Sequence, residues 1–98
     1  MKRYTRKFTP EAARLLAKIP PVAKPFLRAL ADEILLEPYQ GKALRYDLEG
    51  YYSVRHSRYR VIYSIDENRG IVVIEYVGLR RDVYRLFSNL IRTVKRLQ

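Results

Sequence analysis

The chain has 98 residues, 48% of them hydrophobic. It is therefore long enough for one compact domain, expected over residues 1–98, and too apolar for a disordered protein. Its 20 Lys and Arg outnumber its 10 Asp and Glu, which gives a formal net charge of +10. A charge of this size makes the compact state repel itself and predicts a polyanionic partner, either nucleic acid, a membrane surface or an acidic protein.

The residue types that are missing exclude several kinds of site. The chain has no Cys and a single His, His56. These counts exclude a disulfide framework, a thiolate metal site, a cysteine nucleophile and a histidine-based metal cluster. No apolar run reaches the roughly 18 residues that cross a bilayer, and the basic N-terminus lacks the apolar segment of a secretory signal. We therefore expect a soluble, cytoplasmic protein with no metal, no cofactor and no membrane partner.

The first half of the sequence predicts one strand and two helices. Tyr4–Thr9 alternates as a strand does, and the Thr-Pro-Glu that ends it suits the start of a helix. Apolar residues at helical spacing continue until Pro20 and its neighbouring proline stop the helix. A second helix is predicted over Val22–Glu37, with Pro25 tolerated only in its first turn. These two helices would form a hairpin.

The second half changes to a strand-rich pattern. Tyr39–Glu49 is mostly polar, and turns are expected at Gly41 and Gly50. Strands are predicted over Tyr51–His56, Tyr59–Ile65 and Ile71–Val77, and an Asp-Glu-Asn-Arg-Gly turn joins the last two. The third strand begins with four apolar residues in a row, which is typical of a strand covered on both faces. Helical periodicity returns over Val83–Leu97.

This order of elements predicts an α+β fold. It would contain an N-terminal strand, a two-helix hairpin, an antiparallel-rich four-stranded sheet and a C-terminal helix, with the helices on one face of the sheet.

Several basic residues of the predicted strands fall on one side of the sheet. Alternation along Tyr59–Ile65 puts Arg60 on the face that the helical hairpin does not cover. The preceding strand brings Arg55 and His56 near it, and Arg80 follows the last strand. Because adjacent strands lie about 4.8 Å apart, the three arginines could converge on one phosphate-sized position.

Each of these residues also has a structural interpretation. Arg60 could be a solvated strand arginine, and His56 a turn or strand-end residue. Tyr84, near the start of the last helix, could be a half-buried packing aromatic. The Arg and Lys residues of the C-terminal helix are typical of a hydrated helix face. The functional interpretation rests on several arginines and a tyrosine lying near one sheet face in a chain of high positive charge.

Arginine and tyrosine without metal ligands suit the cleavage of RNA. The ribose 2′-OH can attack its own neighbouring phosphate, so the protein has to position that phosphate, neutralise its growing charge and move protons. Arginine performs the first two tasks, and proton transfer would fall to Tyr84, His56 or Glu49. DNA, which lacks the 2′-OH, would be spared. Composition and spacing alone indicate an anion-binding groove, without showing a nuclease.

Two segments carry a resemblance to a known family. The stretch GYYSVRHSRYRVIY over residues 50–63 and the stretch VGLRRDVY over residues 77–84 resemble the RelE/ParE superfamily of type II toxins. The resemblance covers nearly the whole chain and implies the fold predicted above. Its RelE branch cleaves mRNA in the ribosomal A site without a metal, leaving a 2′,3′-cyclic phosphate. Its ParE branch shares the fold and inhibits DNA gyrase.

The resemblance also implies roles for individual residues. Arg60 matches the arginine that holds the scissile phosphate, Arg80 the arginine that stabilises or protonates the leaving group, and Tyr84 the aromatic that stacks on a base or helps to activate the 2′-OH. Ser53 falls where the best-studied RelE pattern has a lysine, so it lacks that positive charge. Further substrate contacts are expected from Arg55, His56, Arg58 and Arg81.

The presence of Arg60, Arg80 and Tyr84 favours the RelE branch. We therefore expect a ribosome-dependent mRNA endonuclease held inactive by an acidic, partly disordered antitoxin. The alternatives are a ParE-like inhibitor of DNA gyrase and a basic RNA-binding module without turnover.

Overall fold

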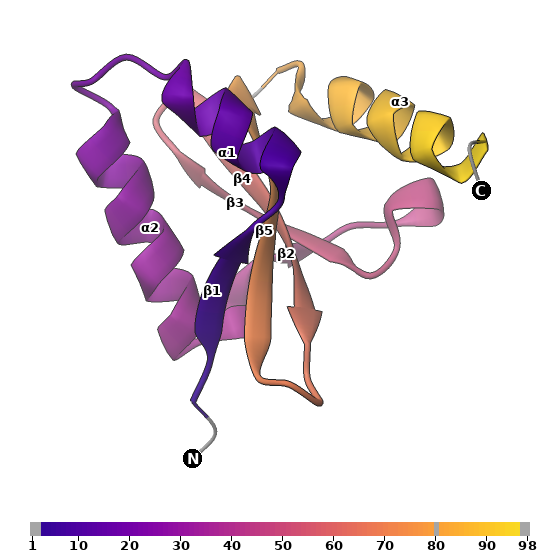
Figure 1. Cartoon of the computed structure of the whole chain (residues 1–98), viewed down its shortest axis with the longest axis horizontal. Coiled ribbons are helices and arrows are strands. Elements are labelled where there is room, and N and C mark those ends of the chain that lie inside the picture. The colour runs from indigo at the N-terminus through magenta and orange to yellow at the C-terminus, as the bar shows by residue number, and fades with distance from the viewer. Residues whose placement is uncertain (1–2, 80, 97–98) are drawn as a thin grey trace.

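The computed structural model describes residues 3–79 and 81–96 (Figure 1). Its elements follow the predicted order closely, with short additional elements between α2 and β3. In chain order they are β1 (Thr5–Phe8), α1 (Pro10–Ala17), α2 (Lys24–Leu36), the 3₁₀ turn η1 (Pro38–Gln40), β2 (Lys42–Ala43), the 3₁₀ turn η2 (Tyr46–Leu48), β3 (Tyr51–His56), β4 (Tyr59–Asp66), β5 (Ile71–Leu79) and α3 (Val83–Arg96).

The strands form one five-stranded sheet in the order β1-β5-β4-β3-β2. β1 pairs with β5 in parallel, and the other neighbours are antiparallel. The prediction of four strands was short by one, because β2 has only two residues and lies in the polar stretch before β3. Gly41 precedes β2, and a Cβ on it would lie 2.3 Å from the Tyr63 hydroxyl. Only glycine allows this close approach, so it lets the chain reach the edge of the sheet.

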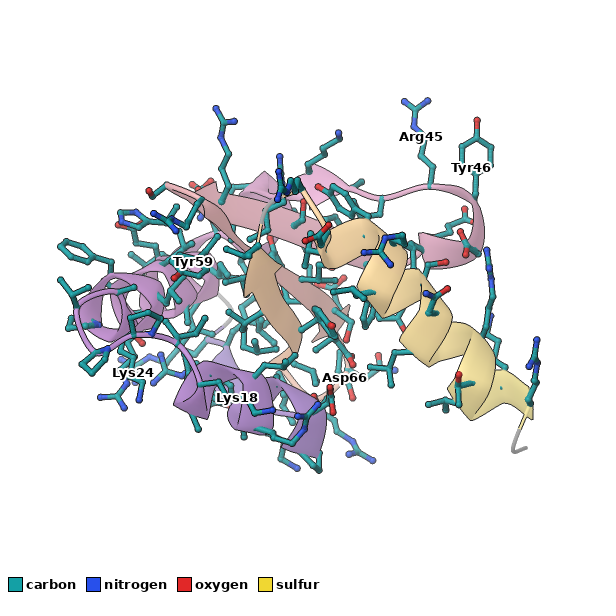
Figure 2. All side chains as sticks on the ribbon, turned by 90° about the horizontal axis from the view of Figure 1, so that it is seen from above. Lys18, Lys24, Arg45, Tyr46, Tyr59 and Asp66 are labelled. Carbon is teal, nitrogen blue, oxygen red and sulfur yellow. The ribbon has the colours of Figure 1, made fainter. Side chains whose placement is uncertain are left out.

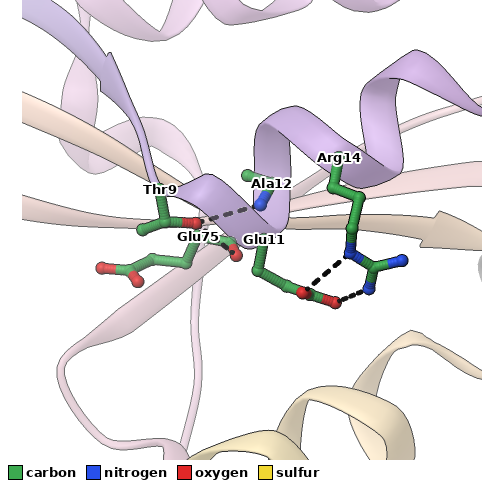
Figure 3. A network of polar contacts seen from close by, with 5 residues as sticks. All are labelled: Thr9, Glu11, Ala12, Arg14 and Glu75. Atoms are coloured by element: carbon green, nitrogen blue, oxygen red, sulfur yellow. Dashed lines mark hydrogen bonds and ion pairs between the residues drawn. The ribbon is translucent and has the colours of Figure 1, made fainter.

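The start of α1 is fixed by a side chain that also contacts the sheet (Figure 3). The Thr9 hydroxyl accepts a hydrogen bond of 3.0 Å from the amide of Ala12 and donates one of 3.2 Å to the carbonyl of Glu75. Glu75 lies at an irregularity of β5, where the register with β4 shifts by one residue. Thr9 is therefore the helix cap that the sequence predicts, and it also binds a carbonyl that lies at the bulge.

The hairpin of α1 and α2 covers one face of the sheet. Its buried residues, such as Ala12 and Ile34, pack against Val61, Tyr63 and Ile74. In α2, Pro25 lies in the first turn, as the sequence requires. This face holds the larger of the two cores.

The C-terminal helix α3 covers the opposite face. Val83 and Phe87 of α3 pack against Ile62 and Tyr76, and residues next to one another in a strand point to opposite faces. The expectation that all helices share one face is therefore wrong. Apolar residues of β4 and β5 also point to this second face, where they form a smaller core. α3 shields that core from water. Within the described ranges, no helix combines the length and the apolar character of a bilayer-spanning segment.

Candidate anion-binding site beside the C-terminal helix

The register of β2, β3 and β4 places polar side chains side by side on the α3 face. Ser53 lies opposite Lys42 on one side and Ile62 on the other, and Arg55 lies opposite Arg60. Cross-strand partners share a face of the sheet, and Ile62 faces the core beneath α3. Lys42, Ser53, Arg55 and Arg60 are therefore neighbours on this face.

The first turn of α3 adds an aromatic hydroxyl to this group. Val83 and Phe87 are 0% and 1% exposed, and this anchorage fixes the ring of Tyr84 above Arg60. The guanidinium carbon of Arg60 lies 5.3 Å from the centre of the Tyr84 ring, within the range of a cation–π contact. The hydroxyl oxygens of Tyr84 and Ser53 are 2.9 Å apart and share a hydrogen bond.

Ser53 joins the side chains of Arg60 and Tyr84. It is 2% exposed, and its Oγ accepts a hydrogen bond of 3.1 Å from Nη1 of Arg60 while also bonding to Tyr84. Arg60, Ser53 and Tyr84 thus form a connected cluster, called here the Arg60–Ser53–Tyr84 cluster. A serine makes this connection without adding a second positive charge beside the arginine.

The guanidinium of Arg60 has hydrogen-bond donors that no described residue accepts. Its Nε is buried and has no hydrogen-bond partner among the described residues. Neither Arg60 nor Arg55 takes part in an ion pair within residues 3–79 and 81–96. A guanidinium carries several N–H donors in a planar fork, and within the described part of the chain only one donor of Arg60 makes a hydrogen bond. The cluster is therefore poised to bind a planar or tetrahedral oxyanion.

Two hollows in the surface adjoin the cluster. One, of about 390 Å³, is lined by Arg55, Arg60 and Ser53 from the sheet and by Glu33 from α2. The other, of about 590 Å³, reaches Tyr84. Lys42 borders both. An extended polyanion could therefore pass over the cluster from one hollow to the other.

The structure brings together only part of the predicted site. Arg55, Arg60 and Tyr84 lie as the sequence indicates, with Arg60 on the face away from the helical hairpin. Arg80, which was expected to join them, lies outside the described residues. Arg81 is exposed in the turn before α3.

The two remaining candidates lie elsewhere. The ring of His56 stacks on Phe26 of α2, with centroids 5.1 Å apart. Arg58 lines the same hollow as these two rings, at the α2 side of the β3–β4 turn. The expectation that His56 lies beside Arg60 is therefore wrong: His56 pairs with Tyr59, on the other face of the sheet, and its side chain packs against the helical hairpin. Glu49, the carboxylate considered for proton transfer, is exposed and lines neither hollow at the cluster.

Sequence reasoning missed three residues near the cluster. Lys42, Arg45 and Tyr46 line the larger hollow, and all lie in the stretch predicted only as polar. The one available signal was a basic residue beside an aromatic at positions 45 and 46. Ser53 was noticed as a missing charge, and its role as a connection between Arg60 and Tyr84 was not foreseen.

The fold and the site together define a small basic α+β protein whose candidate oxyanion site lies between a sheet and a C-terminal helix. Residues 3–84 match the family described as "ParE toxin of type II toxin-antitoxin system, parDE". Toxin RelG of Mycobacterium tuberculosis is 39% identical over 84 residues, which cover 84% of this chain and 97% of RelG. Toxin RelE of the same organism is 36% identical over 85 residues, covering 85% of this chain and 88% of RelE.

A solved structure agrees with these sequence relatives. A chain of the toxin-antitoxin complex RelBE2 from M. tuberculosis is 39% identical and superposes with a TM-score of 0.75, covering 80% of this chain and 99% of that one. The chain belongs to the RelE/ParE superfamily of type II toxins. The resemblance read from residues 50–63 and 77–84 is thereby confirmed.

Proposed function

We propose that this toxin is a metal-independent, ribosome-dependent mRNA endonuclease. The observation that carries the proposal is the Arg60–Ser53–Tyr84 cluster, in which a guanidinium with unused donors lies over the Tyr84 ring and is linked through Ser53 to the Tyr84 hydroxyl, beside an open basic surface. The two relatives named RelG and RelE favour the RelE branch.

In the proposed reaction, the ribose 2′-oxygen attacks the adjacent phosphorus and the bond from phosphorus to the 5′-oxygen breaks. The products are a 2′,3′-cyclic phosphate and a 5′-hydroxyl. Arg60 and Arg55 would bind the nonbridging oxygens and offset the charge that grows on them. Arg80 is proposed to act on the leaving oxygen, and Arg81 to bind the RNA backbone. Because His56 and Arg58 face the helical hairpin, they are not part of the proposed site.

The role of Tyr84 follows from its hydrogen bond. Ser53 Oγ accepts from Arg60, so its own hydrogen is available to the Tyr84 oxygen. The Tyr84 hydrogen would then be free to donate to the RNA, while its ring offers a surface for a base. We propose that Tyr84 orients the reacting nucleotide and takes part in proton transfer.

We also propose that an acidic antitoxin is the partner that keeps the toxin inactive. The toxin in the RelBE2 structure is part of a toxin-antitoxin complex. A chain of net charge +10 attracts an acidic segment, which would compete with RNA for Arg55 and Arg60.

Primer extension on mRNA from cells expressing the toxin tests the nuclease proposal. We expect cuts at positions phased with codons, and a loss of at least about a hundredfold in cleavage for Arg60→Ala. Arg69→Ala is the matched control, because Arg69 is an exposed arginine in the turn at the other end of β4. Intact mRNA, or equal cutting by the Arg60→Ala variant, would contradict the proposal.

Inhibition of DNA gyrase is the second candidate function. It is favoured by the match to the family described as ParE toxin and by Ser53, which stands where the RelE pattern has a lysine. This candidate predicts growth arrest with intact mRNA and accumulation of supercoiling intermediates trapped on gyrase. The two functions are distinguished by measuring both readouts in the same cells.

A further inference from the structure

Tyr46 combines two features that folding alone does not explain. Its side chain is 89% exposed, and its backbone has a φ of 59°. This left-handed conformation is unfavourable for residues other than glycine, most of all for bulky ones. Burial would be the usual compensation for a bulky residue there, and Tyr46 has almost none. No ring contact of Tyr46 is found among the described residues.

The turn that carries Tyr46 is held in place by contacts of the two residues that follow Tyr46. Leu48 is 7% exposed and belongs to the core under α3. Asp47 accepts a hydrogen bond from the Ser88 hydroxyl and forms an ion pair of 3.6 Å with Arg92, so α3 holds the turn. The Ser88 hydrogen bond also lowers the pKa of Asp47. Tyr46 is therefore displayed on an anchored turn, with its ring directed into solvent.

Tyr46 is one of the residues that line the larger hollow beside the cluster. Tyr84 lines the same hollow, together with Lys42, Arg45 and Leu48. Figure 2 shows the side chains of Arg45 and Tyr46 standing next to each other and pointing away from the body of the protein. The described lining thus offers an aromatic ring at each of two positions and two cations, and it includes no carboxylate.

This arrangement matches the chemistry of single-stranded nucleic acid. Bases stack on aromatic rings, and the phosphates between them bind lysine and arginine. An acidic peptide would use the cations equally well and would leave the exposed ring without a role. The pairing of Tyr46 with Tyr84 across a basic hollow therefore favours RNA over a protein ligand.

We propose that Tyr46 is a base-stacking residue for a nucleotide that neighbours the one held at the Arg60–Ser53–Tyr84 cluster, with Arg45 binding an adjoining phosphate. The inference rests on the proposed function for the identity of the substrate. It adds a second nucleotide subsite, built from η2 and the residue before it. The left-handed backbone at Tyr46 is what turns the ring outward to reach this nucleotide.

Binding of a labelled single-stranded oligoribonucleotide tests this subsite without cleavage. Every 2′-OH of the probe is methylated, so that it cannot react, and the dissociation constant is measured by fluorescence anisotropy at several salt concentrations. Tyr46→Gly is the central variant, because it removes the ring and relieves the backbone strain together. Tyr46→Trp restores a stacking surface, and Tyr39→Ala removes an exposed tyrosine that does not line this hollow.

We expect Tyr46→Gly to weaken binding about tenfold at every salt concentration, with an unchanged salt dependence. Arg45→Ala should instead reduce the slope of log affinity against log salt by about one. Tyr46→Trp should bind at least as well as the wild type, and Tyr39→Ala should bind equally well. If Tyr46 had only a structural role, Tyr46→Gly would not lower the affinity while leaving the salt dependence unchanged.

Three results would overturn the proposal. They are equal binding by Tyr46→Gly and the wild type, failure of the wild type to bind the probe, and an effect of Tyr46→Gly confined to antitoxin affinity. A failure of the proposed nuclease activity can be distinguished from these three results. If the wild type leaves mRNA intact and Tyr46→Gly still loses affinity for the probe, the stacking site stands and the proposed reaction falls.

Discussion

The two faces of the sheet are built from the same strands and serve different purposes. The face under the α1–α2 hairpin has a mostly apolar centre and is closed by two helices. The face under α3 has a smaller core, and only Val83 and Phe87 of the 14-residue helix are buried. Beyond that core, the register continues with Ser53, Arg55 and Arg60 in place of apolar residues.

This difference explains how a small domain can hold a charged site. The hairpin face provides most of the buried apolar area, which is the main favourable contribution to folding. The α3 face can therefore leave an arginine with unused donors next to a hydroxyl network. Four predictions test this division, in order of decreasing effect.

The hairpin face should carry the larger share of stability. Ile34 of α2 is 0% exposed, so Ile34→Ala is expected to lower the free energy of unfolding by about 2–5 kcal/mol through lost burial and the remaining cavity. Leu36→Ala on the same helix is the control, since Leu36 is 82% exposed and should change stability by less than about 0.5 kcal/mol. Urea unfolding measures both. Equal losses of stability in the two variants would contradict the larger contribution of the hairpin face.

The cluster on the α3 face should be energetically coupled. Ser53→Ala removes the hydroxyl shared by Arg60 and Tyr84 and is expected to cost about 1–2 kcal/mol of unfolding free energy. Tyr84→Phe removes the other end of the same hydrogen bond. In a double-mutant cycle, the two changes should show an interaction energy of about 0.5 kcal/mol or more. Additive effects would mean that the hydroxyls do not interact in solution.

A half-buried carboxylate gives the α3 face a pH dependence of its own. Ser64 lies opposite Tyr51, whose ring packs on Phe87, and its hydroxyl donates to Glu75 at 2.7 Å. Burial raises the pKa of Glu75 from its ordinary 4.5, and the Ser64 hydrogen bond opposes this in part.

Because the folded state binds this proton more tightly, the stabilisation is complete below about pH 4.5 and is lost as the pH rises through the folded-state pKa. Glu75→Gln keeps an oxygen for Ser64 and cannot ionise. Urea unfolding at several pH values should therefore show the wild type losing stability, relative to this variant, as the pH increases from about 4.5. Parallel pH profiles would show that Glu75 does not titrate as its burial implies.

The smallest effect is expected at the exposed turn. Tyr46→Gly relieves a left-handed backbone at a site without packing, while glycine makes the unfolded chain more flexible. The net change should be a gain of roughly 0.5 kcal/mol in unfolding free energy. A clear loss of stability would show that the Tyr46 ring packs in solution, which would weaken the case for a free stacking surface.

The success of sequence reasoning varied with the range of the interaction. Thr9 and Pro10 predicted the start of α1, because capping involves residues within one turn. Strand alternation placed Arg60 on the face away from the hairpin, because neighbouring side chains point to opposite sides. His56 was grouped with its neighbour Arg55, although alternation within β3 puts the two on opposite faces: Arg55 pairs with Arg60, and His56 pairs with Tyr59 on the hairpin side. β2 was missed because two residues carry no periodicity.

The sequence by itself determined the element types, the basic character of the chain and the family, since each of these is contained in short segments or in composition. Only the tertiary structure decided that α3 closes the second face, that Ser53 links Arg60 to Tyr84, and that Tyr46 stands at the edge of the same hollow. Those contacts join residues that are distant in the chain. Their geometry depends on strand register and on how Val83 and Phe87 dock the last helix, and neither is encoded in any local pattern.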